Sequence, residues 1–391
     1  WKSISNGSTA MLIEGARRVG KSTVAKEFGE KEYGSYILVD FTRVNDEFKQ
    51  TFLDTRMDLD SFFLYLQAAF GTTLEKRNSL IIFDEVQLFP PAREFIKHLV
   101  ADGRYDYLET GSLISLNANV KNILIPSEET GCSFTVLNRS AKDIVIPSEE
   151  RHIKMYPMDF EEFLWAMGER PLATFIRNSY ESGKGLPDSL HRKAMRLWNE
   201  YTLVGGMPQA VAAYEPERDL MAAERAKHLI LKLYREDIEK YGGLASKRIK
   251  AIFDAIPGQL SKHEKKLTYS QVEENSRSRD FVDAFAWLKE AATVNLCTAC
   301  TDPSVGLALS EDASVVKCYM ADTGLLSSMA FNAAGEHMPE AYRQTLLGNA
   351  SVNEGMLTEN AVAQQLVARQ HPLHFYSCSS RTSKEDRMEI D

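Results

Sequence analysis

Long apolar runs are absent from this chain of 391 residues, because none approaches the roughly 18 residues that a membrane-spanning helix needs. Cysteine is scarce, and the five residues form an odd, scattered set that fits a reducing cytosol better than a disulfide framework. Positive charge is not in excess either, since the formal net charge is −9. No global field therefore attracts nucleic acid or an anionic membrane. We expect a cytoplasmic protein without a membrane segment, in which any DNA contact comes from a local basic face.

The bulk composition is that of an ordinary globular protein, with 44% hydrophobic and 26% charged residues. The length suffices for roughly two to four domains with substantial cores. The chain begins at Trp1 rather than Met, so we expect a fragment, for which the sequence says nothing about a leader peptide.

The most informative segment is Gly15–Ser22, which reads GARRVGKS and matches G-x-x-x-x-G-K-[ST]. Met11–Ile13 before it is typical of the end of a buried strand, and Thr23–Phe28 after it of the first turns of a helix. A strand that turns sharply into a helix points backbone N–H groups at the positive end of the helix dipole, where phosphate binds. Gly15 and Gly20 allow the tight backbone path. The alternative is a chance match in a loop that contains Gly and Lys.

Within this loop the side chains have separate predicted roles. Lys21 is expected to reach the β- and γ-phosphates, and the Ser22 hydroxyl to occupy one Mg²⁺ position. Arg17 and Arg18 contact nucleotide or a neighbouring molecule, or are merely exposed. The residues predicted to bind nucleotide here are Gly15, Ala16, Arg17, Arg18, Val19, Gly20, Lys21, Ser22 and Thr23.

A second segment, Ser79–Glu85 (SLIIFDE), is an apolar run that ends in two carboxylates. Consecutive apolar residues indicate burial on both faces, as in a parallel sheet, and the carboxyl end of such a strand lies in the crevice where α/β sheets bind ligands. Asp84 is then placed to hold a Mg²⁺-bound water, and Glu85 to orient or deprotonate the water that attacks the γ-phosphate. The alternative is a strand that ends in solvated acids.

A third strand, Tyr105–Ser112, leads into a Gly turn. Thr110 or Ser112 is placed to sense the γ-phosphate from a neighbouring strand, although an ordinary Thr-Gly-Ser turn is the alternative. Helices between the strands complete a βαβ pattern, which predicts a mostly parallel sheet. The expected strands are Ala10–Ile13, Ser35–Asp40, Leu80–Asp84 and Tyr105–Glu109, with helices such as Leu59–Phe70 and Ala92–Val100.

A local duplication follows, because Lys121–Glu129 recurs as Lys142–Glu150 with seven of nine positions identical. Two copies are too few for a solenoid. We expect residues 121–150 to form a surface excursion without a catalytic role.

The second half of the chain changes character. Asp159 is expected to cap a helix, with Glu162 at the spacing of a capping box. Residues 170–243 are predicted to be largely helical, with a sharp break at Gly205–Pro208. Three short helices and a strand pair then follow in the order of a winged helix-turn-helix, namely Ile252–Leu260, Tyr269–Glu274, Asp280–Ala292, Val294–Thr301 and Val315–Tyr319.

A basic excess accompanies this region. From Ser246 to Asp280 there are eight Lys or Arg against five Asp or Glu, in a chain that is otherwise acidic. The excess predicts either a DNA-binding face or a solvated helix surface. The tail is expected to hold a helix over Asn353–Gln370 and a strand over His374–Ser377.

Taken together, five segments resemble a prokaryotic family of AAA-type P-loop ATPases with a winged-helix region and a C-terminal DUF4143 domain. The segments are Gly15–Ser22, Leu80–Gln87, Glu109–Ser112, Gly205–Pro208 and Tyr319–Leu326. The resemblance implies binding of ATP with Mg²⁺ and hydrolysis. It also implies that Gly206 and Pro208 resemble the Gly-x-Pro element through which a helical subdomain reads the nucleotide, with a plain helix–helix turn as the alternative.

The C-terminal part of that family resembles a PD-(D/E)xK nuclease fold. Glu359 and Asp391 match its first two acids, and the chain stops before the third position, so we expect no nuclease activity. The predicted fold class is α/β, with the P-loop NTPase sheet flanked by helices. The predicted domains are a P-loop ATPase domain (1–165), a helical subdomain (166–243), a winged-helix-like domain (244–330) and a truncated nuclease-like segment (331–391).

The sequence thus predicts Mg²⁺-dependent binding and hydrolysis of ATP, with Glu85, Lys21 and Thr110 as catalytic residues and Ser22 and Asp84 at the metal. The alternative is a nucleotide-gated switch that binds DNA or protein with little turnover. A DNA-binding module in which ATP is incidental is a third hypothesis. Expected partners are DNA at the winged-helix-like region, another protein or a second copy of the chain. The preference for ATP over GTP rests on the resemblance.

Overall fold

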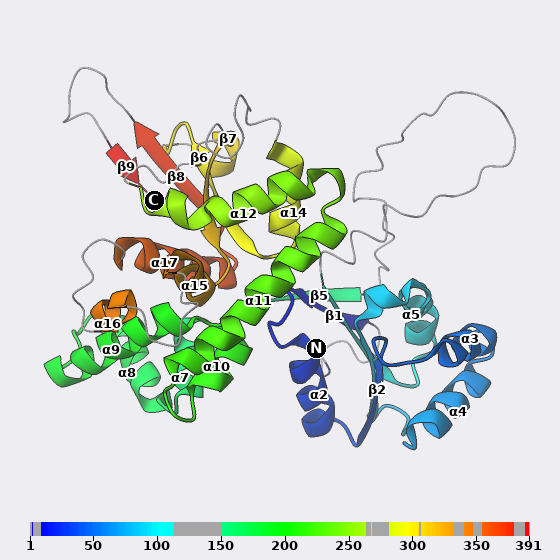
Figure 1. The fold of residues 1–391 in the computed structure, drawn as a ribbon. Helices are drawn as coiled ribbons and strands as arrows, with labels where there is room; N and C mark the ends of the chain where they lie inside the picture. Colours follow the sequence, from blue (N-terminus) through cyan, green and yellow to red (C-terminus); the bar gives the residue numbers. More distant parts are fainter. Residues whose placement is uncertain are drawn as a thin grey trace, which may run out of the picture. The chain divides into compact units, whose positions relative to one another are not determined.

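The computed structural model describes residues 2, 9–112, 150–262, 267, 281–304, 306–331, 340–346, 354–378 and 388–390. These residues form two compact units, Trp1–Met155 and Tyr156–Asp391, which are drawn in Figure 1. Most of the duplicated segment and the expected helix Tyr269–Glu274 lie outside the described residues.

The first unit is built on a five-stranded sheet with the order β2-β3-β4-β1-β5, in which every neighbouring pair is parallel. Its central strands are buried along their whole length, as their continuous apolar sequences predict. The strands are β1 (Ala10–Gly15), β2 (Ser35–Asp40), β3 (Ser79–Asp84), β4 (Asp106–Ser112) and β5 (Glu150–Met155).

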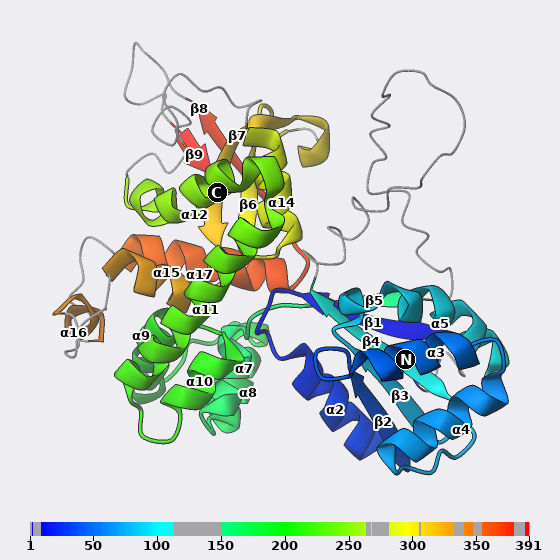
Figure 2. The ribbon, with the colours of Figure 1, turned by 45° about the vertical axis from the view of Figure 1, so that its right-hand side comes forward.

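Helices cover both faces of this sheet, as Figure 2 shows. Helix α2 (Lys21–Glu32) packs on one face, where Ala25 joins an apolar cluster with Ile13 and Ile82. The opposite face carries a larger core with many phenylalanines, supplied by helices α3 (Asp46–Thr55), α4 (Leu59–Phe70) and α5 (Pro90–Asp102).

Local signals explain where these helices begin and end. The side chains of Asn45 and Asp58 accept hydrogen bonds from the first turns of α3 and α4, as N-caps do. Pro90 opens α5, which it can do because the first helical N–H needs no partner within the helix. Gly103 then ends α5 in the left-handed conformation.

The second unit begins with a helical region. Asp159 and Glu162 form the expected capping box at the start of α7, so that prediction is confirmed. The helices of this region are α7 (Phe160–Ala166), α8 (Arg170–Glu181), α9 (Asp188–Val204), α10 (Pro208–Tyr214), α11 (Leu220–Tyr241), η3 (Gly243–Ala245), α12 (Ser246–Leu260) and α14 (Val282–Glu290).

A four-stranded sheet with the order β7-β6-β8-β9 completes this unit. Strands β6 and β7 form the expected strand pair and run antiparallel, and β8 adds to β6 in parallel. Its elements are β6 (Val294–Cys300), η5 (Leu307–Leu309), β7 (Glu311–Met320), α15 (Thr323–Phe331), α16 (Glu340–Leu346), α17 (Glu354–Ala368), β8 (Leu373–Cys378) and β9 (Met388–Ile390).

The predicted sheet of the first half is confirmed, but β5 was not predicted. Its sequence is polar and largely exposed, and it pairs with β1 alone, so it lacks the apolar run that marks a central strand. In the second half, the predicted domains 166–243, 244–330 and 331–391 all lie inside one compact unit, and their boundaries stay predictions. The winged-helix interpretation also stays a prediction. None of the helices described is long and apolar enough to cross a bilayer.

Candidate functional site

The loop between β1 and α2 adopts the backbone path that its sequence predicts. Gly20 caps α2 with a φ of 93°, a left-handed conformation that favours glycine, and Arg18 also has a positive φ of 70°. A Cβ on Gly15 would collide with the carbonyl oxygen of Met155, because β5 runs directly beside it. Alternating conformations of this kind turn successive N–H groups toward one point and form an anion-binding nest.

Lys21 is folded back onto this loop. Its ammonium donates to the carbonyl oxygens of Ala16 at 2.9 Å and Gly15 at 3.2 Å, and the side chain is buried. Burial lowers the pKa of Lys21, and the nearby Glu85 and Asp84 carboxylates oppose that shift. The ammonium therefore has weak carbonyl partners, which a phosphate is able to replace with stronger, charge-assisted bonds.

The remaining loop residues divide by exposure. Ala16 and Val19 are buried, so the side chains at these two positions pack against the protein interior. Arg18 and Thr23 are exposed, and Arg17 is partly exposed. Their predicted contacts with nucleotide stay predictions.

The predicted metal residues Ser22 and Asp84 lie together where α2, β3 and β4 meet. Ser22 at the start of α2 donates its hydroxyl to Asp84 Oδ1 at 2.7 Å, across 62 positions of sequence. Thr110 on β4, the strand between β1 and β3, donates to the same carboxylate oxygen. A hydroxyl and a carboxylate are the oxygen ligands that Mg²⁺ takes beside substrate phosphates.

This donor set suits Mg²⁺ better than a metal held by protein ligands alone. Among the residues that the structure describes, no group of three or more His, Cys, Asp or Glu side chains is arranged to hold a metal ion. Mg²⁺ typically keeps several waters and binds through one or two carboxylates plus phosphate oxygens. Ser22 and Asp84 fit that manner of binding.

Glu85 occupies the turn directly after Asp84. It has a left-handed φ of 54°, and its N–H donates to Thr110 Oγ1 at 3.2 Å. Its carboxylate Oε2 accepts a hydrogen bond from the side-chain amide of Gln87 in η1 (Val86–Leu88). The predicted residues Ser22, Asp84, Thr110 and Glu85 thus form one hydrogen-bonded group, to which the structure adds Gln87.

Sequence reasoning did not single out Gln87 as a functional residue. The signal that could have found it is its position two residues after Glu85, at the end of a strand whose acids were already suspected. A glutamine that close to a carboxylate is within reach of it in any tight turn.

Gly206 and Pro208 belong to the second unit and have packing roles there. The N–H of Gly206 donates to Asp322 Oδ2 at 2.5 Å, and a Cβ at this position would collide with the backbone of Met158. Pro208 opens α10. The interpretation as a helix–helix turn accounts for both residues, and their contact with nucleotide stays a prediction.

Two buried carboxylates, Glu109 and Glu150, lie on the strands β4 and β5 that flank β1. Glu109 on β4 is fully buried, and desolvation raises its pKa well above the usual value. The neighbouring Glu150 adds to this shift, while Arg93 from α5 opposes it. Arg93 binds Glu150 at 3.2 Å, and His152 lies 3.4 Å from the same Glu150 oxygen.

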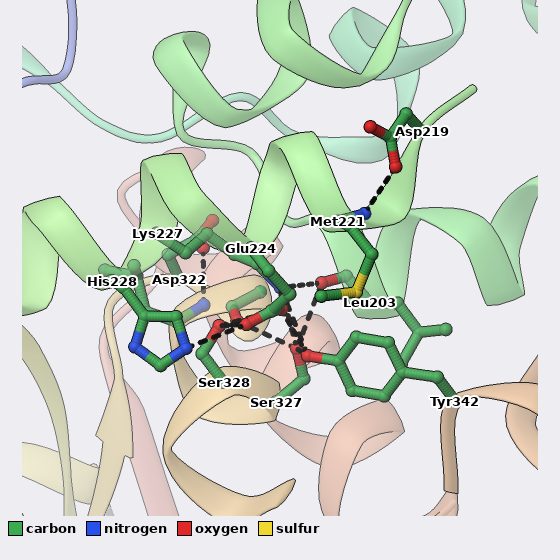
Figure 3. Close-up of polar contacts among 12 residues, drawn as sticks. Leu203, Asp219, Met221, Glu224, Lys227, His228, Asp322, Ser327, Ser328 and Tyr342 are labelled. Carbon is green, nitrogen blue, oxygen red and sulfur yellow. Dashed lines mark hydrogen bonds and ion pairs between the residues drawn. The ribbon is translucent and has the colours of Figure 1, made fainter. Parts of the chain in front are cut away.

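The second unit contains a further buried charged cluster, shown in Figure 3. Glu224 and Lys227 on α11 form an ion pair with only 1% of either side chain exposed. Ser328 donates to Glu224 at 2.8 and 3.0 Å, and Tyr342 donates to it as well. Lys227 also donates to the carbonyl oxygen of Leu203 at 2.6 Å. Each charged group has several partners, so the cluster joins α9, α11, α15 and α16.

Two family models match the chain, over separate ranges. Residues 7–164 match an AAA domain, and residues 195–335 match a domain of unknown function, DUF8612. No curated protein matches. Among solved structures, the Hef helicase domain of Pyrococcus furiosus is similar at 13% identity over 74% of this chain and 67% of that chain, with a TM-score of 0.18. A similarity of that degree carries no argument.

The first match supports the AAA-type P-loop ATPase part of the resemblance. Together with the parallel sheet flanked by helices, it identifies a P-loop NTPase fold followed by a helical region.

The expected DUF4143 domain is wrong, because the matching family is DUF8612. Two of the five segments that carried the resemblance, Gly205–Pro208 and Tyr319–Leu326, lie in the second unit. They form a single packed junction in which Asp322 accepts the N–H of Gly206. A close junction of small residues is a general packing solution, so those motifs did not discriminate between families.

Proposed function

We propose that this protein binds ATP with Mg²⁺ and hydrolyses it at the β1–α2 loop. The observation that carries the proposal is the Ser22–Asp84 hydrogen bond of 2.7 Å, which joins the phosphate-binding loop to the acidic end of β3. The AAA domain match over residues 7–164 supports a nucleotide as the ligand. The choice of ATP over GTP rests on the resemblance to AAA-type ATPases.

In this proposal the N–H groups of Gly15–Ser22 bind the β- and γ-phosphates, and Lys21 exchanges its carbonyl partners for phosphate oxygens. Mg²⁺, when bound by Ser22 and Asp84, would neutralise charge on the phosphates. Glu85 accepts the proton of the attacking water. Thr110 is hydrogen-bonded to both the Asp84 carboxylate and the backbone N–H of Glu85, so it fixes the position of Asp84 relative to Glu85.

Phosphate release and ATP binding, measured side by side, test the proposal. Lys21→Ala should lose ATP binding and hydrolysis together. Glu85→Gln should keep ATP binding and lose at least about 100-fold in kcat, as expected for removal of a general base. Lys26→Ala is the matched control, because Lys26 lies on the same helix with its side chain 57% exposed, and we expect it to behave as wild type.

Two outcomes would contradict the proposal. A wild type that does not bind ATP removes the nucleotide site altogether. A wild type that binds ATP but releases no phosphate removes hydrolysis and leaves the nucleotide-gated switch as the function to test.

A further inference from the structure

We propose that Gln87 is a positioning residue for Glu85, the base of the proposed hydrolysis. The inference rests on the proposed function and adds a residue to the same site. Its starting point is the hydrogen bond from the Gln87 amide nitrogen to Glu85 Oε2.

Gln87 is itself firmly held. It lies in η1, is only 5% exposed, and is flanked by Val86, which is fully buried. The turn is closed by two backbone hydrogen bonds, from Leu88 to the Glu85 carbonyl at 2.9 Å and from Phe89 to the Val86 carbonyl at 3.0 Å. A buried side chain on a closed turn is able to restrict the orientation of its partner.

The backbone of Glu85 is fixed as well. Its left-handed φ of 54° is unusual for a residue with a Cβ, and its N–H is bound to Thr110. Such a conformation persists only where the surroundings hold it. With the backbone and one carboxylate oxygen both fixed, the orientation of the whole side chain is defined.

The two carboxylate oxygens of Glu85 differ in their partners. Oε2 is bound to Gln87, whereas Oε1 accepts no hydrogen bond from any residue that the structure describes. A general base needs one oxygen available to the water and a group that orients the carboxylate. The arrangement matches that need, because Gln87 binds one oxygen and leaves the other for the water.

Loss of this orientation should reduce kcat and leave ATP binding intact, because Glu85 acts on water and the loop Gly15–Ser22 binds the phosphates. We expect Gln87→Ala to lower kcat about 10- to 100-fold, the range expected when a catalytic group is displaced by about 1 Å. The Kd for ATP should change less than about twofold.

Gln87→Glu gives a readout that a structural role would not produce. While the two carboxyls share one proton, that proton makes a hydrogen bond between them in place of the amide. At higher pH the pair loses this proton, and the two carboxylates repel each other. The ratio of its kcat to that of wild type should therefore fall as pH rises, whereas general damage to the fold would lower the ratio equally at every pH.

Gln50→Glu is the matched control. Gln50 is an exposed glutamine on α3 that also donates to a carboxylate, Asp54, at 2.9 Å, so the same change is made outside the site. Its kcat should follow that of wild type at all pH values. Thermal unfolding of each variant verifies that the chain is folded.

The outcomes separate this inference from the proposed function. If wild type hydrolyses ATP and a folded Gln87→Ala keeps its kcat, the positioning role is overturned and the proposed function stands. The same holds if the Gln87→Glu ratio does not depend on pH. A wild type that releases no phosphate overturns both, since no reaction remains for Gln87 to support.

Discussion

The buried ion pair of Glu224 and Lys227 gives the sharpest test of what stabilises the second unit. Lys227→Met removes the cation and leaves a carboxylate with 1% exposure facing two hydroxyls, as Figure 3 makes visible. It also removes the donor to the Leu203 carbonyl. An uncompensated buried charge costs about 3–5 kcal/mol. The cost of leaving the Leu203 carbonyl without a donor is included in this range.

This loss should be visible in both thermal and chemical unfolding. For a unit of this size each kcal/mol shifts Tm by about 2–4 °C, so Lys227→Met should lower the Tm of the second unit by roughly 6–20 °C. Lys232→Met is the matched control on the same helix, because its side chain is 73% exposed, and it should leave Tm within about 2 °C of wild type.

A double variant decides whether charge is the cause. Glu224→Gln combined with Lys227→Met removes both charges and keeps a polar partner for Ser328 and Tyr342. It should be more stable than Lys227→Met alone, because position 224 no longer carries an unpaired buried charge. If Lys227→Met unfolds within about 1 kcal/mol of wild type, or if the double variant is the less stable of the two, the reasoning is refuted.

Two further predictions concern the first unit. Asp84→Asn should raise the Mg²⁺ concentration needed for half-maximal ATP binding about 10- to 100-fold. A titration of ATP affinity against Mg²⁺ concentration measures this midpoint. An unchanged midpoint would show that Asp84 is not part of the metal site. Burial raises the pKa of Glu109 above its ordinary value of 4.5, so above that pH the folded state binds more protons than the unfolded state. The free energy of unfolding should therefore fall as pH rises from there, by up to about 1.4 kcal/mol per pH unit. Glu109→Gln should flatten that slope in Tm measured against pH, and a slope equal to that of wild type would show that another group causes it.

The sequence was sufficient where a signal is local. The loop Gly15–Ser22 and the strand ending at Asp84 are contiguous patterns, and parallel strands align their carboxyl ends, so the meeting of Ser22 with Asp84 could be predicted from two separate segments. The strand Ser35–Asp40 and the helix Leu59–Phe70 were predicted with the bounds that the structure has.

What could not be predicted depends on distant partners. Strand β5 is polar, and only its pairing with β1 makes it a strand. The raised pKa of Glu109 arises from burial beside Glu150, which is 41 positions away and on a strand that the sequence does not mark. The partners of Lys227 come from α9, α11, α15 and α16, and neither periodicity nor motif spacing indicates that these helices meet there.

Thr110 shows why the site should act as a unit. Its hydroxyl is the donor to Asp84 and the acceptor from the N–H of Glu85, so one side chain on the middle strand connects the metal ligand with the base. If Mg²⁺ were bound by the Ser22 hydroxyl, Asp84 would lose one of the two hydroxyl donors that it has in this structure. The bond to Thr110 must compensate for that loss, and any shift of Thr110 moves the backbone of Glu85. In the proposed function, three consecutive hydrogen bonds would thus connect occupancy of the phosphate loop with the orientation of Glu85.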